Sequence, residues 1–97
     1  MNSQYSQLSN EKTAIPTAHQ ALRDKVFDLI NAERDRQDAK WGRKDGKWPS
    51  TNHTKMTVLT EEVGEIAKSI LDGDAQGMID ELVQVAAVAV AWLETQV

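Results

Sequence analysis

The chain has 97 residues, no cysteine and a formal net charge of −4. This length corresponds to one small domain, and domains of this size often complete their core by oligomerising. The lack of cysteine excludes a disulfide framework and a cysteine-based zinc site, and it is typical of a reducing compartment. No basic segment followed by a long apolar stretch opens the chain, so we expect a cytoplasmic protein without a signal peptide.

The charge is unevenly distributed along the chain. Residues 1–49 carry a net charge of +2, whereas residues 50–97 carry −6. The acidic second half argues against a nucleic-acid polymer as partner and is compatible with metal cations, while the first half can offer positive charge to phosphates. The simpler alternative is two solvated surfaces of opposite sign. The longest apolar run, residues 85–93, is half of the roughly 18 residues that cross a bilayer, so we expect no membrane span.

The N-terminal third predicts an arm followed by a helix. Residues 1–16 are polar without sustained periodicity and predict a flexible arm, so the helical domain is expected to occupy residues 17–97. Thr17 can cap a helix whose Gln20 reaches back to it. Apolar residues then follow at helical spacing, and the helix is expected to end near Lys40, before Gly42.

Two further helices follow a loop at residues 42–52, which is rich in turn-forming residues. The second is expected to begin between His53 and Thr57 and to end at Gly73. Asp74 is a suitable N-cap for a third helix over residues 75–94. That helix is apolar on nearly every side from residue 82 to 93, so we expect it to be buried all round, partly at a subunit interface. The predicted fold is all-α, a small bundle of about three main helices completed by dimerisation.

Three glutamates interrupt the apolar stripe of the second helix. With Leu59 at zero and about 100° per residue, Glu62 falls at about −60°, on the flank of the stripe, and Glu65 at about −120°, at its edge. Glu61 falls near the opposite side. Glu62 and Glu65 are i, i+3 neighbours, so their carboxylates can meet.

The third helix carries a carboxylate of the same kind. Glu81 lies on an apolar face of a helix that we expect to be buried, together with Gln84, Val85, Val88 and Trp92. An unpaired buried carboxylate either binds a proton or acquires a cation. Two interpretations therefore remain open. Either these acids are satisfied by Lys68, by arginine from the first helix or by water, or they hold a hard divalent cation such as Mg²⁺ or Mn²⁺ through oxygen ligands.

These motifs resemble a known superfamily. The segments "EEVGE" (61–65) and "ELVQ" (81–84) are similar to the ExxE…ExxD signature of the all-α NTP pyrophosphatases, which include MazG and the dimeric dUTPases. The segments "ERDRQDAKWG" (33–42) and "ELVQVAAVAVAWLE" (81–94) look more narrowly like the small MazG-like proteins of phages and prophages. The resemblance covers about residues 20–97.

The resemblance implies a helical bundle completed by dimerisation, often as a dimer of dimers. It also implies hydrolysis of nucleoside triphosphates to monophosphate and pyrophosphate, with Mg²⁺ held by the acidic motif. Glu62 and Glu65 match the ExxE, and Glu81 matches the first residue of ExxD. Gln84 stands where the family has Asp, and its carbonyl oxygen can bind a metal but carries no charge. An acid that does not bind metal can serve as base for water, and Glu61 and Glu62 are the candidates.

Residues outside the acidic motif are candidates for nucleotide binding. Trp41, beside Lys40 and Arg43, can stack on a base while the two cations meet phosphates, or it can anchor the following loop. Lys55 can approach phosphates from the start of the second helix, although a surface lysine is the simpler interpretation. The sequence thus predicts a metal-dependent (d)NTP pyrophosphohydrolase with a role in cleaning nucleotide pools. The alternative is a catalytically weak or inactive bundle that binds nucleotides or a protein partner, and Gln84 favours it.

Overall fold

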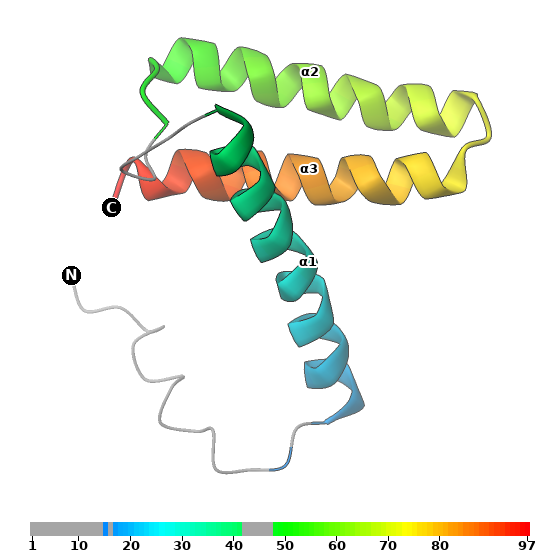
Figure 1. The fold of residues 1–97 in the computed structure, drawn as a ribbon. Helices are drawn as coiled ribbons and strands as arrows, with labels where there is room; N and C mark the ends of the chain where they lie inside the picture. Colours follow the sequence, from blue (N-terminus) through cyan, green and yellow to red (C-terminus); the bar gives the residue numbers. More distant parts are fainter. Residues whose placement is uncertain (1–14, 16, 42–47) are drawn as a thin grey trace.

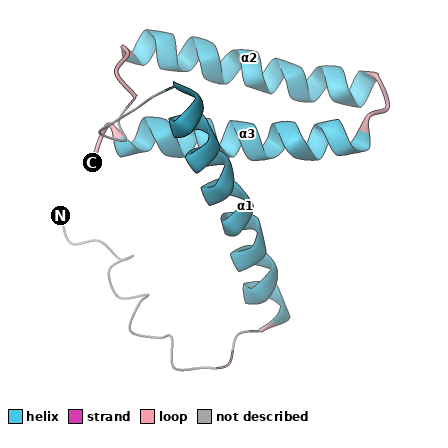
Figure 2. Cartoon of the chain, in the orientation of Figure 1, coloured by secondary structure: helices cyan, strands magenta, loops and turns pink. Residues whose placement is uncertain are grey.

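The structure, a computed structural model, describes residue 15, residues 17–41 and residues 48–97. These residues form three helices, α1 (Ala18–Trp41), α2 (Asn52–Leu71) and α3 (Ala75–Glu94), and the described part contains no strand (Figure 2). The predicted all-α fold is confirmed. The predicted N-terminal arm lies outside the described residues except for Ile15, which is exposed.

The three helices are arranged around α3. α2 and α3 form an antiparallel hairpin, and the C-terminal half of α1 crosses α3 while its N-terminal half projects away (Figure 1). Among the described residues α3 packs against both other helices, whereas α1 and α2 do not pack against each other. Side chains of α2 therefore meet those of α3 across the hairpin, which brings the two acidic motifs together.

Local capping explains where the helices begin. The Thr17 hydroxyl oxygen accepts a hydrogen bond from the Gln20 backbone N–H at 3.1 Å, and Gln20 Oε1 accepts one from the Thr17 N–H at 2.8 Å. This is the reciprocal capping pair predicted from the sequence. Asp74 caps α3 as predicted, because its Oδ1 accepts from the Gly77 N–H at 2.8 Å.

The start of α2 differs slightly from the prediction. The helix begins at Asn52 because Thr51 caps it, with its hydroxyl accepting from the Thr54 N–H at 3.2 Å. Thr51 lies within a cluster of turn-forming residues. The sequence therefore does not distinguish a helix cap at Thr51 from an ordinary loop residue. At the other end Gly73 has a φ of 68°, the left-handed conformation that glycine adopts without steric cost. It follows Leu71, the last residue of the helix.

The core is small and lies where the other helices meet α3. Ala87, Val88 and Ala91 on α3 are at most 2% exposed, and Ile30 of α1 is buried with them. Two alanines at this point allow the helices to approach closely. Within the single chain α3 is not buried all round, because three of its large apolar side chains remain about half exposed: Ile79, Leu82 and Leu93. Its burial at a subunit interface stays a prediction.

The apolar character of α3 extends beyond its longest uninterrupted apolar run. α3 is long and apolar enough, by length and composition alone, to cross a membrane, and among the described helices only α3 meets this criterion. The sequence argument counted only the uninterrupted run over residues 85–93, whereas α3 also carries apolar residues before it, among them Met78, Ile79 and Leu82. In this structure α3 is also the helix against which α1 and α2 pack.

Candidate metal and nucleotide site

The structure brings together one carboxyl group from each acidic motif. Glu62 on α2 and Glu81 on α3 are both half-buried, and their carboxyl groups lie close enough to share a proton. Burial raises the pKa of Glu62 above its ordinary value. The neighbouring carboxyl of Glu81 raises this pKa further, and the charges of Glu61 and Glu65 add to the effect. We refer to Glu62 and Glu81 as the acid pair.

The acid pair lacks a hydrogen-bond donor when both members are ionised. Glu81 Oε2 is buried and has no hydrogen-bond partner among the residues that the structure describes. Two adjacent carboxylates repel each other, and an ionised carboxylate can only accept hydrogen bonds. A shared proton, a bound cation or a further hydrogen-bond donor such as water would satisfy both groups.

Three cationic side chains of the described residues are paired with other carboxylates. Lys68, which the sequence offered as a partner for Glu65, instead forms an ion pair with Asp72 at 2.7 Å. The two arginines at the C-terminal end of α1 also have other carboxylates, with Arg34 bound to Asp38 and Glu94, and Arg36 bound to Glu33. Within the described part of the chain, neither member of the acid pair has an ion pair.

The remaining predicted metal ligands do not join the acid pair directly. We expected Glu62, Glu65 and Glu81 to converge, but Glu65 is exposed, and no three His, Cys, Asp or Glu side chains among the described residues gather closely enough to hold one metal ion. Glu65 lies one turn beyond Glu62 and about 60° further from the apolar stripe, so it points past the hairpin interface. Gln84 is half-buried on α3, one turn after Glu81, and Glu61 is exposed.

The predicted nucleotide-binding residues are divided between two places. Lys40 and Trp41 are exposed at the end of α1, with Trp41 about half exposed, and Arg43 lies outside the described residues. Lys55 is only 4% exposed, so its interpretation as a surface lysine is wrong. It lies seven residues before Glu62 on α2, a separation of about 10 Å along the axis.

Lys55 is occupied by the segment that leads into α2. Its ammonium group donates a hydrogen bond to the Ser50 carbonyl oxygen and lies 5.8 Å from the centre of the Trp48 ring. These contacts bury the lysine by fixing the turn before the helix, a role that spacing in the sequence does not reveal. The structure thus shows Lys55 as a structural residue, and its approach to phosphates stays a prediction without support from its contacts.

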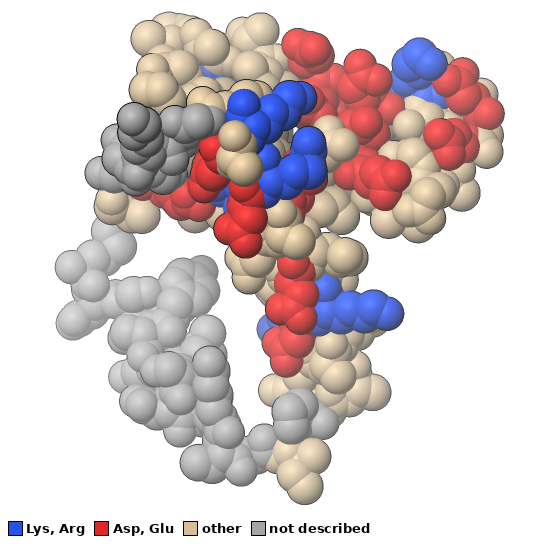
Figure 3. All heavy atoms as spheres, viewed as in Figure 1, with Lys and Arg blue, Asp and Glu red and all other residues tan. Residues whose placement is uncertain are grey.

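Charges of both signs lie on one face of the molecule. Figure 3 shows acidic side chains gathered over α2 and α3, with Lys and Arg side chains beside them where the end of α1 lies in Figure 1. The charge of Glu62 also contributes to raising the pKa of Arg36, after the larger effect of Glu33. Arg36 lies four residues before Lys40, and this spacing places both cations on one face of α1.

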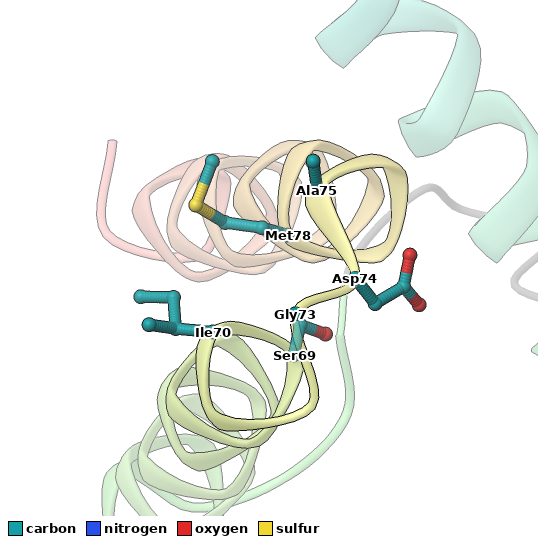
Figure 4. A pocket seen from close by; sticks show the side chains of 6 residues that line it. All are labelled: Ser69, Ile70, Gly73, Asp74, Ala75 and Met78. Carbon is teal, nitrogen blue, oxygen red and sulfur yellow. The ribbon is translucent and has the colours of Figure 1, made fainter.

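A separate open pocket of about 220 Å³ lies at the turn between α2 and α3 (Figure 4). Its lining is mostly apolar and contains none of the predicted site residues: Ser69, Ile70, Gly73, Asp74, Ala75 and Met78. The candidate site is therefore the charged surface around the acid pair and not this pocket.

Compared with models of protein families, with curated proteins and with solved structures, the chain matches none of them.

Proposed function

We propose that the chain is a metal-dependent nucleoside triphosphate pyrophosphohydrolase, converting a (d)NTP and water to a (d)NMP and pyrophosphate. The observation that supports this proposal is the acid pair, because two carboxyl groups from different helices face each other without a cationic partner among the described residues. Proteins retain such an arrangement at a cost in stability, and a cation-dependent activity gives it a purpose. The resemblance of the two acidic motifs to those of MazG-like proteins supports the same reaction.

The residues present fit a divalent cation. The buried Glu81 Oε2 without a partner, beside a second carboxyl group, offers the oxygen ligands that Mg²⁺ and Mn²⁺ prefer. Glu62 and Glu81 would hold the ion, with Gln84 one helical turn after Glu81, and water and phosphate oxygens would complete its ligands, because Glu65 points past the hairpin interface. The ion supplies neutralisation of phosphate oxygens and a more acidic bound water.

The chain's own side chains provide the remaining functions. Glu61 is exposed and directly precedes Glu62 in the sequence, so it can accept a proton from water. Glu62 is the alternative base if it does not bind the metal ion. Lys40 and Trp41 at the end of α1 are the proposed contacts to phosphate and base. Because phosphoryl transfer depends mostly on positioning and charge, this set of groups is chemically sufficient for the reaction.

The decisive experiment measures pyrophosphate release from a panel of NTPs and dNTPs with Mg²⁺ or Mn²⁺. We expect metal-dependent release from at least one nucleotide, its loss in EDTA, and at least a hundredfold lower kcat/KM in Glu62→Gln. Asp80→Asn is the matched control, because Asp80 is an exposed acid next to Glu81 in the sequence. The side chain of Asp80 accepts a hydrogen bond from Gln76. Release that survives EDTA, or full activity in Glu62→Gln, would contradict the proposal.

A second candidate function is a weak or inactive bundle that binds nucleotides or a protein partner. Gln84 favours it, since the neutral amide leaves this position without the charge that the resembling family carries. The variant Gln84→Asp separates the two functions. A rise in metal-dependent turnover supports an enzyme limited by the missing charge, whereas nucleotide binding without turnover in both wild type and variant supports the binding protein.

We also propose that the chain acts as a homodimer or homotetramer. The projecting half of α1 carries large apolar side chains that are 44–61% exposed, and α2 and α3 add more: Leu22, Val26, Phe27 and Leu29, with Met56, Val63, Ile70, Ile79, Leu82 and Leu93. Large apolar side chains exposed in this number are typical of a surface that another subunit covers. Light scattering coupled to gel filtration tests the proposal, and a monomer at micromolar concentration would contradict it.

A further inference from the structure

Three consecutive residues of α3 point to three different sides of that helix. Trp92 donates a hydrogen bond to Asn52 of α2, and the Glu94 carboxylate binds Arg34 of α1. Leu93 lies about 100° from each of its two neighbours, so it faces neither α1 nor α2, and it is 60% exposed. α3 therefore has a third side on which, within the described part of the chain, no other helix packs.

This third side of α3 is apolar along the whole helix. Leu82 and Ile79 lie 11 and 14 residues before Leu93, which places both within about 40° of it, and each is nearly half exposed. Ala86 and Ala89 lie between Leu82 and Leu93 on the same side. The resulting spacing alternates between three and four residues, which is the spacing of a seam along which two helices pack.

α2 continues this apolar surface beside α3. Glu62 is half-buried in the hairpin, so its two neighbours in the sequence, Glu61 and Val63, point to opposite faces of the hairpin. Because α2 runs antiparallel to α3, its side chains rotate in the opposite sense, and Val63 projects to the side of the α3 seam. Met56 and Ile70 lie seven residues before and after Val63 and share its direction, and all three are 49–60% exposed.

We call this combined surface of α2 and α3 the apolar hairpin face. By the same helical angles, it contains none of the charged residues of the two helices, whereas Glu61, Glu65 and Asp80 project to the opposite face, on the side of α1. Figure 3 shows acidic side chains gathered over α2 and α3 in the view in which α1 crosses α3. The large apolar side chains of the apolar hairpin face are Met56, Val63, Ile70, Ile79, Leu82 and Leu93.

The apolar hairpin face is large enough to hold two chains together. α2 and α3 have 20 residues each. Such helices are about 30 Å long, and two of them side by side, each about 10 Å wide, present roughly 600 Å². Two faces of this size bury about 1,200 Å², the lower end of the range for stable complexes. The part of α1 before Ile30, its first buried residue, presents only roughly 180 Å², which is too little for a dimer by itself.

The lack of charge on this face favours a second copy of the chain as its partner. Nucleic acids and anionic membranes bind through basic side chains, and the apolar hairpin face has none. A partner with a charged surface would lose hydration there without gaining an ion pair. An identical apolar face carries no charge that repels it, and a two-fold axis joins two copies of the same patch.

We propose that the apolar hairpin face packs against the same face of a second copy, so that four helices form the core of a homodimer. α1 and the acid pair of each protomer then lie away from the interface. This inference rests on the homo-oligomer proposed above and specifies the surface through which it forms. It also leaves the proposed metal site complete within each protomer.

Light scattering coupled to gel filtration tests the apolar hairpin face with a matched pair of variants. We expect Leu82→Glu to weaken dimerisation at least roughly a hundredfold, because each dimer would bury two unpaired carboxylates. Leu71→Glu is the control, since Leu71 is 87% exposed and lies about 80° from Val63 around α2, outside this face. We expect it to remain as dimeric as wild type.

A thiol reporter tests the same face without adding charge. The chain has no cysteine, so Leu82→Cys and Leu71→Cys each introduce a single reactive group. At concentrations where wild type is dimeric, we expect alkylation to be at least tenfold slower in Leu82→Cys than in Leu71→Cys, because the interface covers the first position. After dilution below the dimer Kd, the two rates should become similar, since both positions are exposed in the single chain.

The outcomes separate this inference from the other proposals. A wild-type dimer that Leu82→Glu leaves intact, or in which both thiols react equally fast, would show that another surface forms the oligomer, and this inference alone would be wrong. A monomeric wild type would overturn both the inference and the proposed oligomer. In such a monomer, slow alkylation of Leu82→Cys would show that the chain itself covers the face, and binding to neutral phospholipid vesicles would show that a membrane does. Pyrophosphate release tests the enzyme separately.

Discussion

Two clusters of buried or half-buried charges lie on α3 and are built in opposite ways. Near its C-terminal end, the guanidinium of Arg34 is 6% exposed and binds carboxylates on both sides, Glu94 at 2.7 Å and Asp38 at 2.9 Å. Nearer its middle, Glu81 faces Glu62 without a cation among the described residues. The hydrogen bonds to Glu94, and then those to Asp38, raise the pKa of Arg34, which favours the charge already present.

The difference shows which cluster serves the fold and which does not. At the first cluster Arg34 binds both carboxylates, and its ion pair with Glu94 joins α1 to α3. At the second, the arrangement opposes ionisation of Glu62 and therefore weakens the folded state at neutral pH. A small domain has little stability to lose, so an uncompensated pair is best explained by a ligand that the folded state binds.

The largest effect is expected at the compensated cluster. Arg34→Met retains an apolar side chain of similar length but leaves Glu94 and Asp38 without their cation. We expect a loss of about 2–3 kcal/mol in the free energy of unfolding, and a fall in Tm of roughly 10 °C or more, measured by circular dichroism. Arg23→Met, on the exposed half of α1, should change Tm little. Equal effects of the two substitutions would show that the Arg34 cluster does not hold α1 to α3.

Binding of Mg²⁺ at the acid pair should raise the stability of the protein, whereas the Arg34→Met substitution should lower it. We expect MgCl₂ at 10 mM, about the upper end of a useful titration, to raise the Tm of wild type by several degrees, because an ion bound only by the folded state stabilises it. Glu62→Gln should lose this response while being more stable than wild type in EDTA. NaCl at equal ionic strength is the control for screening. A Tm that rises equally in both proteins would show that the cation does not bind at the acid pair.

The sequence predicted the elements of this fold because their signals are local. Thr17 with Gln20, and Asp74 before Gly77, mark helix starts through contacts three residues apart, and both are present in the structure. The all-α class and the span of α3 follow from the same kind of local pattern. In contrast, α1 packs on α3 and not on α2. This choice depends on contacts between residues far apart in the sequence, and helical periodicity carries no information about such contacts.

The candidate site was predictable only in part, for the same reason. Helical angles placed Glu62 and Glu81 on packing faces, and the hairpin brings these two together. Glu65 was predicted at the edge of the apolar stripe, where the exact rotation of α2 decides whether a side chain is buried or exposed. In the structure Glu65 is exposed. Lys55 was misjudged because its partners, Ser50 and Trp48, approach through a turn whose path the sequence does not specify.

The pH dependence of stability provides a smaller effect at the acid pair. The folded-state pKa of Glu62 is raised above its ordinary value of 4.5, so its stabilising contribution is complete below that pH and is lost as pH rises through the raised pKa. We therefore expect the stability advantage of Glu62→Gln over wild type in EDTA to be largest at pH 7 and to shrink as pH falls toward 4.5. Thermal melts of both proteins across this range test it. An advantage that grows on acidification would contradict the direction of this shift.

The smallest effect is expected at Lys68, and it tests whether this lysine competes for the acidic site. Lys68 is exposed and its ion pair with Asp72 contributes little, although the charge of Glu65 also favours its protonated form. Because the contact at 2.7 Å is to Asp72, we expect Lys68→Gln to leave both the Tm in EDTA and the Mg²⁺-induced rise unchanged within error. A larger Mg²⁺ response in Lys68→Gln would show that the lysine neutralises the acidic cluster in solution. The acid pair would then resemble the Arg34 cluster, with a cation of its own chain, and the contrast between the two would no longer indicate a ligand site.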